Sequence, residues 1–187
     1  KQLEKQKYIV INRISGTSIG SICGLLYIID KLELGINAFN IMRDGFKNTG
    51  TLRSAEIWLK HLFKSFPVDT YKLCNGRLYI TYFDLIKCKE CVISKYKNNN
   101  HIMKSINKSM FIPYLLNGTL AYKNKYIDGF YPHMFKENIN IKNVYINLQS
   151  IYKFTEILKI SHDKNSYRRI LDAINDTHTF YLLNKPN

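Results

Sequence analysis

The segment Gly16-Thr17-Ser18-Ile19-Gly20 has the G-x-S-x-G spacing of a nucleophilic serine on a sharp turn. Such a turn joins a strand to a helix and holds the serine at strained backbone angles, so the positions two residues away on either side must be small. Here both positions are glycines, Gly16 and Gly20. The start of a helix also stabilises a negatively charged oxygen beside the serine through the helix dipole. The pattern therefore indicates Ser18 as a nucleophile.

A second candidate group, Asp128, lies 110 residues further along the chain and is followed by Gly129. Serine is a poor nucleophile until a base removes its proton, and a carboxylate within hydrogen-bond reach can act as that base. Because a carboxylate is a weak base, such a pair depends on stabilisation of the oxyanion and on a partly desolvated site. An Asp-Gly pair is also a common turn, so its surroundings must distinguish it.

The elements around Ser18 are predicted to be a strand and a helix. Residues 8–14 are β-branched and aromatic, which is typical of a buried strand. From Ile19 to about Lys31 apolar residues lie on nearly all sides of a helix, which predicts that the helix is central and buried. The other expected elements are helices at 36–47, 51–66, 101–110 and 166–181, and strands at 77–83, 86–94 and 141–148. Alternating strands and helices predict an α/β fold with a largely parallel sheet.

Three motifs follow one another along roughly residues 1–150: the G-x-S-x-G turn, a Ser-x-x-Ile-Pro segment at 109–113, and Tyr126-Ile127-Asp128-Gly129 with Pro132. In this combination the chain resembles the patatin-like phospholipases. The resemblance implies a three-layer α/β/α fold with a mostly parallel central sheet. It also implies a single domain over residues 1–187, with a C-terminal helical extension at 150–187.

For the site, the resemblance implies that Ser18 is the nucleophile and Asp128 the general base of a dyad without histidine. The residues implied to support the motif and the oxyanion are Gly16, Ile19, Gly20 and Gly129. The implied function is that of a serine lipid acyl hydrolase, which cleaves fatty-acyl ester bonds of phospholipids or related lipids through an acyl-enzyme intermediate. No cofactor or metal is expected, and calcium is not indicated, because the sequence has no Asp/Asn-rich loop of oxygen ligands.

The glycine-rich oxyanion loop of that family is expected on a strand-to-helix turn before the serine, but residues 1–15 contain no glycine. Residues 1–7 are polar and helix-favouring, which predicts the end of a helix that begins upstream. We therefore expect the first strand and the glycine-rich loop to lie upstream of Lys1.

Two other classes of function stay open. An α/β-hydrolase carries its triad in the order Ser, Asp or Glu, His, which Ser18, Asp128 or Asp163, and His162 or His178 could supply. The chain could also be a catalytically inactive patatin-like module, or a basic module that binds membranes or nucleic acid. In that case the turn is only structural, and Ser18 caps the helix.

The chain carries 28 Lys and Arg against 14 Asp and Glu, a net charge of +14. Such a charge attracts polyanions, although a compositional bias toward Lys, Asn, Ile and Tyr explains it equally well. Because the basic residues are scattered, with no run of five or more, we expect peripheral contact with an anionic membrane surface and no specific nucleic-acid partner. Apolar stretches at 36–46, 58–66 and 111–116 are candidates for an acyl-chain groove, and each also fits an ordinary core.

The longest uninterrupted apolar stretch, residues 22–29, has eight residues, whereas a membrane-spanning helix needs about 20. We therefore expect a cytoplasmic or peripheral membrane protein, and targeting stays open because the chain begins with Lys. Cys88 and Cys91 have the C-x-x-C spacing of half a zinc site, but zinc needs four ligands and no second pair follows. We expect these thiols to be buried or half-buried on a strand.

Overall fold

The computed structural model describes residues 2–137 and 141–146, together with Leu171, Ile174, Asn175, His178, Thr179 and Leu182. The chain divides into two compact units, Lys1–Tyr145 and Ile146–Asn187. In the second unit, the six described residues between 171 and 182 are helical. Five of them fall within the helix predicted at 166–181. Every candidate site residue named above except His162, Asp163 and His178 lies in the first unit.

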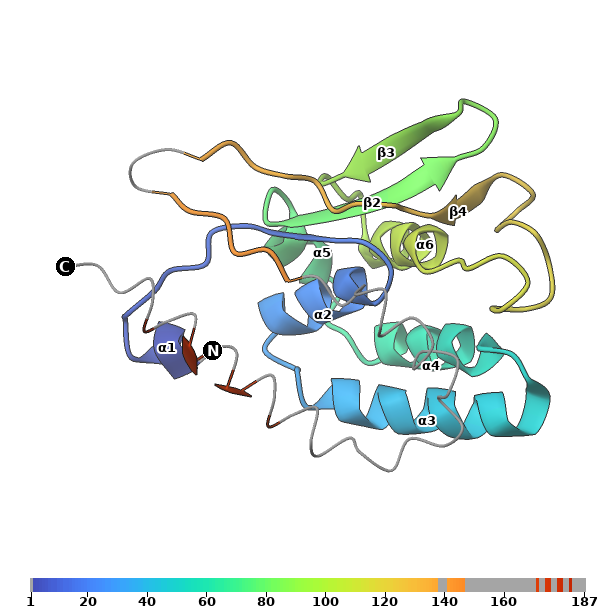
Figure 1. The fold of residues 1–187 in the computed structure, drawn as a ribbon, viewed down its shortest axis with the longest axis horizontal. Coiled ribbons are helices and arrows are strands. Elements are labelled where there is room, and N and C mark those ends of the chain that lie inside the picture. Colours follow the sequence, from blue (N-terminus) through green and yellow to red (C-terminus); the bar gives the residue numbers. More distant parts are fainter. Residues whose placement is uncertain are drawn as a thin grey trace. The chain divides into compact units, whose positions relative to one another are not determined.

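The first unit contains the predicted helices and strands between residues 19 and 110, with ends that differ by at most three residues. A short helix at residues 2–5 agrees with the helix end predicted at residues 1–7, whereas a second short helix, at residues 70–74, was not predicted. The elements run in the order α1 (Gln2–Lys5), β1 (Ile14–Gly16), α2 (Ile19–Ile28), α3 (Leu34–Thr49), α4 (Arg53–Lys64), α5 (Thr70–Cys74), β2 (Leu78–Asp84), β3 (Lys89–Ile93), α6 (Asn99–Ser109) and β4 (Tyr126–Asp128) (Figure 1).

The sheet mixes parallel and antiparallel strands. β1 pairs with β2 in parallel, whereas β3 and β4 both pair with β2 antiparallel. The prediction of a largely parallel sheet is therefore wrong for the described strands. The reason is the connection between β2 and β3, which spans only residues 85–88. A connection this short can join only antiparallel neighbours, because a parallel pair needs a crossover of a dozen or more residues.

β1 and β4 share one edge of β2, and β3 occupies the other edge. β1 runs alongside the first part of β2 and ends where Gly16 lies opposite Ile80. β4 runs the opposite way along the second part and ends where Asp128 lies opposite Tyr82. The carboxyl ends of β1 and β4 therefore meet beside Thr81, although they are more than a hundred residues apart in the sequence.

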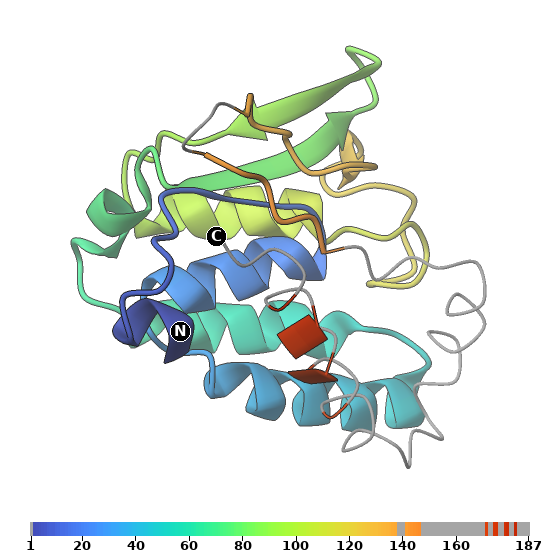
Figure 2. The same cartoon turned by 60° about the vertical axis from the view of Figure 1, so that its left-hand side comes forward.

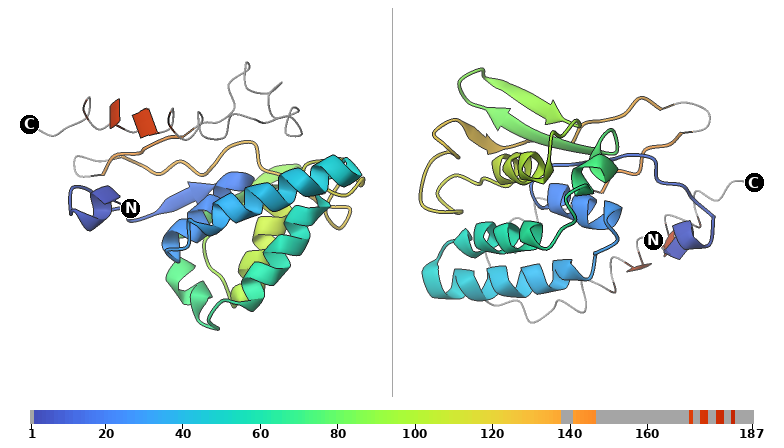
Figure 3. Two further views of the ribbon diagram at one scale, coloured as in Figure 1. Left: turned by 90° about the horizontal axis from the view of Figure 1, so that it is seen from below. Right: turned by 180° about the vertical axis from the view of Figure 1, so that it is seen from behind.

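Four helices of the first unit, α2, α3, α4 and α6, stack on one side of the sheet. α2 and α6 lie directly against it, and α3 and α4 form a further layer beneath them (Figures 2 and 3). On the opposite face, Tyr79 and Phe83 contact the rings of His133, Phe135 and Phe130. Among the described helices of the first unit, none covers that face. The fold is thus of the mixed α/β class, and the expected α/β/α layering is not confirmed.

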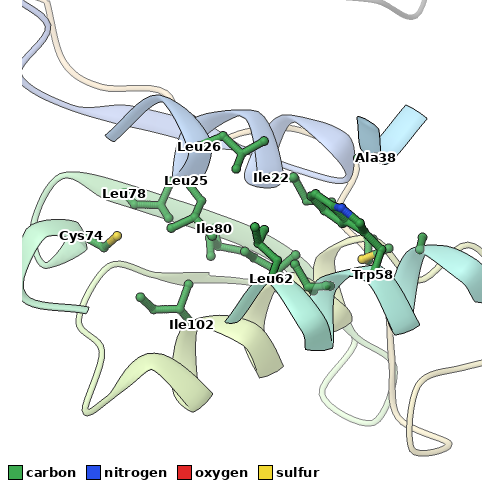
Figure 4. Packing of buried hydrophobic residues seen from close by; sticks show 14 of the residues in the cluster. Ile22, Leu25, Leu26, Ala38, Trp58, Leu62, Cys74, Leu78, Ile80 and Ile102 are labelled. Carbon is green, nitrogen blue, oxygen red and sulfur yellow. The ribbon is translucent and has the colours of Figure 1, made fainter. Parts of the chain in front are cut away.

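The core lies between α2, α4, α6 and β2 (Figure 4). Ile22, Leu25 and Leu26 of α2 are almost fully buried, which confirms the prediction of a central helix. Gly24 allows α2 to approach the sheet closely, since a Cβ there would lie 2.9 Å from the side chain of Leu78.

The strand predicted at 8–14 is much shorter than expected. Only its last residue, Ile14, belongs to β1, and Tyr8 and Val10 are 64% and 79% exposed. β2 begins at Leu78, so residues 8–13 have no partner strand in the described part of the chain. A β-branched composition favours a strand only where a neighbouring strand and a packed face are present. The strand predicted at 141–148 is also missing from residues 141–146, and the rest of it lies outside the described residues.

Candidate active site

Ser18 lies in a strained turn between β1 and α2. Its backbone angles are φ 54° and ψ −132°, outside the regions that residues other than glycine usually occupy. A backbone conformation of this kind costs about 1–3 kcal/mol and is found mostly at functional sites. The Ser18 side chain makes no capping hydrogen bond to α2. Helix capping therefore does not explain why a serine stands at this position.

The two glycines of the motif are not equivalent. A Cβ on Gly16 would overlap the carbonyl group of Gly20 and lie 2.6 Å from the backbone nitrogen of Ser21. A Cβ on Gly20 would meet no atom within 4 Å. The close approach of β1 to the first turn of α2 thus requires glycine only at the first position. The expectation that both positions must be small is wrong for Gly20.

Ser109, at the end of α6, fixes the position of the Ser18 turn through hydrogen bonds. The backbone N–H of Ser18 donates to Ser109 Oγ at 3.0 Å and to the Ser109 carbonyl at 3.1 Å. Ser109 Oγ in turn donates to the carbonyl of Thr81 in β2 at 2.6 Å, and Ser109 is fully buried. Ser109 is the first residue of the Ser-x-x-Ile-Pro segment. The sequence showed that this segment is present, but it did not show that the segment contacts Ser18.

Asp128 is held by the same segment. Its backbone N–H donates to the carbonyl of Phe111 at 2.9 Å. Residues 109–111 therefore contact both the turn that carries Ser18 and the end of the strand that carries Asp128. The segment thus bridges the first and third motifs.

The carboxylate of Asp128 meets the turn directly. The hydroxyl of Thr17 donates a hydrogen bond to Asp128 Oδ1 at 3.1 Å. Burial raises the pKa of Asp128 to about 6, although the polar groups of Ser18 and Thr17 beside the carboxylate and the N–H of Gly129 lower it. The structure thus brings Ser18 and Asp128 together as a hydroxyl beside a partly desolvated carboxylate.

Thr17 and Gly129 form a second contact between the two motifs. Thr17 Oγ1 lies 2.9 Å from the carbonyl oxygen of Gly129. A Cβ on Gly129 would lie 2.7 Å from that same Oγ1 and 2.9 Å from the carbonyl oxygen of Thr81, so glycine is required there. Sequence reasoning missed Thr17. Its position inside the motif was visible, but spacing alone does not say where its side chain points.

Ile19 offers a backbone donor next to Ser18. As the first residue of α2 its N–H has no acceptor within the helix, and none is found among the described residues. The N–H of Ser18 is already used by Ser109. The N–H of Ile19 is therefore the group that the turn itself can offer to a developing oxyanion.

The histidines of the first unit lie elsewhere. His101 accepts from the backbone N–H of Lys97 and packs against Tyr96, while His133 stacks on Tyr79. Within residues 2–137 no histidine hydrogen-bonds Ser18 or Asp128. His162 and Asp163 lie outside the described residues, and His178 belongs to the second unit. The Ser-Asp-His alternative stays a prediction.

The cysteines do not assemble a metal site in the described part of the chain, where no three His, Cys, Asp or Glu side chains cluster. Cys91 is half-buried on β3, as expected, but Cys88 is exposed in the turn that precedes β3. Cys74 is buried in α5, and this burial raises the pKa of its thiol to about 12. Cys74 thus has the environment of a structural rather than a reactive cysteine.

Comparison of the chain with protein-family models, with curated proteins and with solved structures finds no match. The resemblance to the patatin-like phospholipases therefore rests on the three sequence motifs alone. Among the helices that the structure describes, none has the length and apolar character needed to cross a membrane.

Proposed function

We propose that this protein is a serine lipid acyl hydrolase with a patatin-like α/β/α fold, in which Ser18 is the nucleophile and Asp128 the general base. One observation carries the proposal: the turn of the strained Ser18 lies against a carboxylate whose pKa is raised by burial to about 6. Backbone strain and a perturbed pKa are each more frequent at catalytic sites than elsewhere. Their coincidence at residues 110 positions apart favours a catalytic pair over a structural turn.

In the proposed reaction, Asp128 takes the proton of the Ser18 hydroxyl as Oγ attacks the ester carbonyl carbon. The electron pair of the carbonyl moves to its oxygen, and the N–H of Ile19 and the N-terminal end of α2 stabilise that charge. The bond to the alcohol then breaks, and Asp128 returns the proton to the departing oxygen. Water attacks the acyl-enzyme by the same route and releases the fatty acid and free Ser18.

The raised pKa suits Asp128 to this role. A carboxylate with its ordinary pKa near 4 is a weak base, whereas one with a pKa of about 6 accepts a proton more readily. At pH 7 such a group is still mostly ionised and thus able to accept the proton.

For the acyl chain of a lipid substrate, we propose the surface of α3 and α4 as the candidate groove. Between these helices lies a hollow of about 410 Å³, lined mainly by apolar side chains: Asn37, Ile41, Ser54, Ile57, Trp58, His61 and Leu62. Ile36 and Ile57 are more than half exposed there. The apolar stretches at 58–66 and 111–116 belong largely to the core of the first unit, since Leu59, Leu62 and Phe111 are buried.

The proposal is tested by a fluorophosphonate probe, which reacts with activated serines. We expect the probe to label the full chain at Ser18, with a rate that rises as pH increases through about 6. Below that pH Asp128 is protonated and cannot act as a base, so at pH 5 the rate should be about a tenth of its plateau. Mass spectrometry of the labelled peptide identifies the site, and Ser18→Ala is the control. No labelling of Ser18 would favour the inactive-module alternative.

Contact with membranes gives a separate prediction. With a net charge of +14, the protein should bind anionic vesicles about tenfold or more tightly than neutral ones, because each lysine near the surface contributes about 1 kcal/mol. The difference should shrink as salt shortens the Debye length from about 10 Å at 0.1 M to about 3 Å at 1 M. Vesicle co-sedimentation measures this, and equal binding to both vesicle types at low salt would contradict it.

A further inference from the structure

We propose that Thr17 is a positioning residue, whose hydroxyl orients the Asp128 carboxylate toward Ser18 and stabilises its ionised form. This inference rests on the proposed function, in which Asp128 is the base. It adds a third member to the site, one that touches neither substrate nor the reacting oxygen.

The hydroxyl of Thr17 lies among three acceptors. Its Oγ1 is 3.1 Å from Asp128 Oδ1, 2.9 Å from the carbonyl oxygen of Gly129 and 3.4 Å from that of Thr81. A hydroxyl carries one proton, so these acceptors compete for it. The carbonyl of Thr81 already accepts a short hydrogen bond from Ser109 and does not depend on Thr17. The competition is therefore between the carboxylate of Asp128 and the carbonyl of Gly129.

The charge on Asp128 decides this competition. A hydrogen bond to an ionised carboxylate is roughly twice as strong as one between neutral groups, so the Thr17 proton points to Asp128 when that group is ionised. When Asp128 has taken up a proton, both acceptors are neutral, and the shorter distance favours Gly129. Rotation of one hydroxyl then follows each proton transfer at the base without any movement of the backbone.

The local sequence fits this role. Thr17 is the neighbour of Ser18, so the chain segment that carries the nucleophile also holds the base, and the two cannot separate without breaking that contact. The β-branched side chain of threonine restricts rotation about χ1, which fixes Oγ1. The absence of a Cβ at Gly129 leaves the space that Oγ1 occupies.

A purely structural role for Thr17 makes a different prediction from a positioning role. Loss of packing would lower activity by the same factor at every pH. Loss of a donor to the ionised carboxylate would instead raise the pKa of Asp128 further, because the hydrogen bond from Thr17 is among the causes that lower it. Activity would then fall most at low pH.

The test uses Thr17→Val, which keeps the branched shape but has no donor, and Thr17→Ser, which keeps the hydroxyl. The acid limb of kcat/KM for Thr17→Val should move up by about one pH unit, with about a tenfold loss near pH 5, about a fivefold loss near pH 6 and a much smaller loss near pH 9. Thr17→Ser should restore the wild-type acid limb. Thr17→Ala serves as a second variant without a donor, should Thr17→Val fail to fold.

The ionisation of Asp128 is also followed by carbon NMR of the labelled carboxyl group, which does not require activity. A higher pKa in Thr17→Val than in wild type supports the inference even if no hydrolysis is detected and the proposed function fails. An unchanged pKa, a uniform loss of activity at all pH values, or a Thr17→Ser variant that behaves like Thr17→Val would each overturn it.

Discussion

Replacing Ser18 by alanine or Asp128 by asparagine should lower kcat/KM for a fatty-acyl ester by about 10³-fold or more. Alanine removes the attacking oxygen, and asparagine cannot accept its proton. Because the two side chains act as a unit, the double variant should lose little more than either single one. Initial rates with a chromogenic ester and with phospholipid vesicles measure these effects.

The histidines provide the control for this prediction. His162→Ala and His178→Ala should stay within a few-fold of wild type, because a Ser-Asp dyad needs no histidine. A collapse of activity in either variant would replace the dyad by the Ser-Asp-His triad that the order of residues also permits.

Loss of activity in Asp128→Asn should not come from loss of the fold. A carboxyl group whose pKa is raised in the folded state binds its proton more tightly there than in the unfolded chain, so stability falls as pH rises from about 4 to about 6. At pH 7 the ionised carboxylate is thus a net cost, and Asp128→Asn should stabilise the protein by about 1–3 kcal/mol. Thermal unfolding at pH 7 checks this, and a lower Tm for Asp128→Asn would contradict it.

Replacing Gly16 by alanine should destabilise the protein by about 3 kcal/mol, which corresponds to a fall in Tm of roughly 6–12 °C for a chain of this size. The added Cβ would overlap the carbonyl of Gly20, and backbone cannot rotate away as a side chain could. Relief of this overlap must move β1 and α2 apart and so shift Ser18. Fluorophosphonate labelling of Ser18 should be lost together with stability.

Gly20→Ala is the matched control for this variant. Its Cβ would meet nothing within 4 Å, and the residue lies in α2, where alanine is favoured over glycine by up to about 1 kcal/mol. We expect a Tm equal to or above that of wild type. Equal destabilisation by the two substitutions would mean that the turn does not have the geometry described above.

Local patterns in the sequence determined the elements and the two candidate groups. The helical periodicity after Ile19, the alternating segments around residue 80, and the G-x-S-x-G spacing each depend on a few neighbouring residues. They correctly predicted α2, the two strands β2 and β3 and a strand-to-helix turn at Ser18. Asp128 could be selected because an Asp-Gly pair followed the Ser-x-x-Ile-Pro segment.

Only the tertiary structure decided how these elements pair and which side chains meet. Periodicity reports which face of a segment is buried, but it does not identify the neighbouring strand or its direction. The antiparallel course of β4, the short β1 and the meeting of both strands beside Thr81 depend on contacts between distant residues. The roles of Thr17 and Ser109, and the difference between Gly16 and Gly20, follow from that meeting, because each depends on distances of a few ångströms between segments that the sequence keeps far apart.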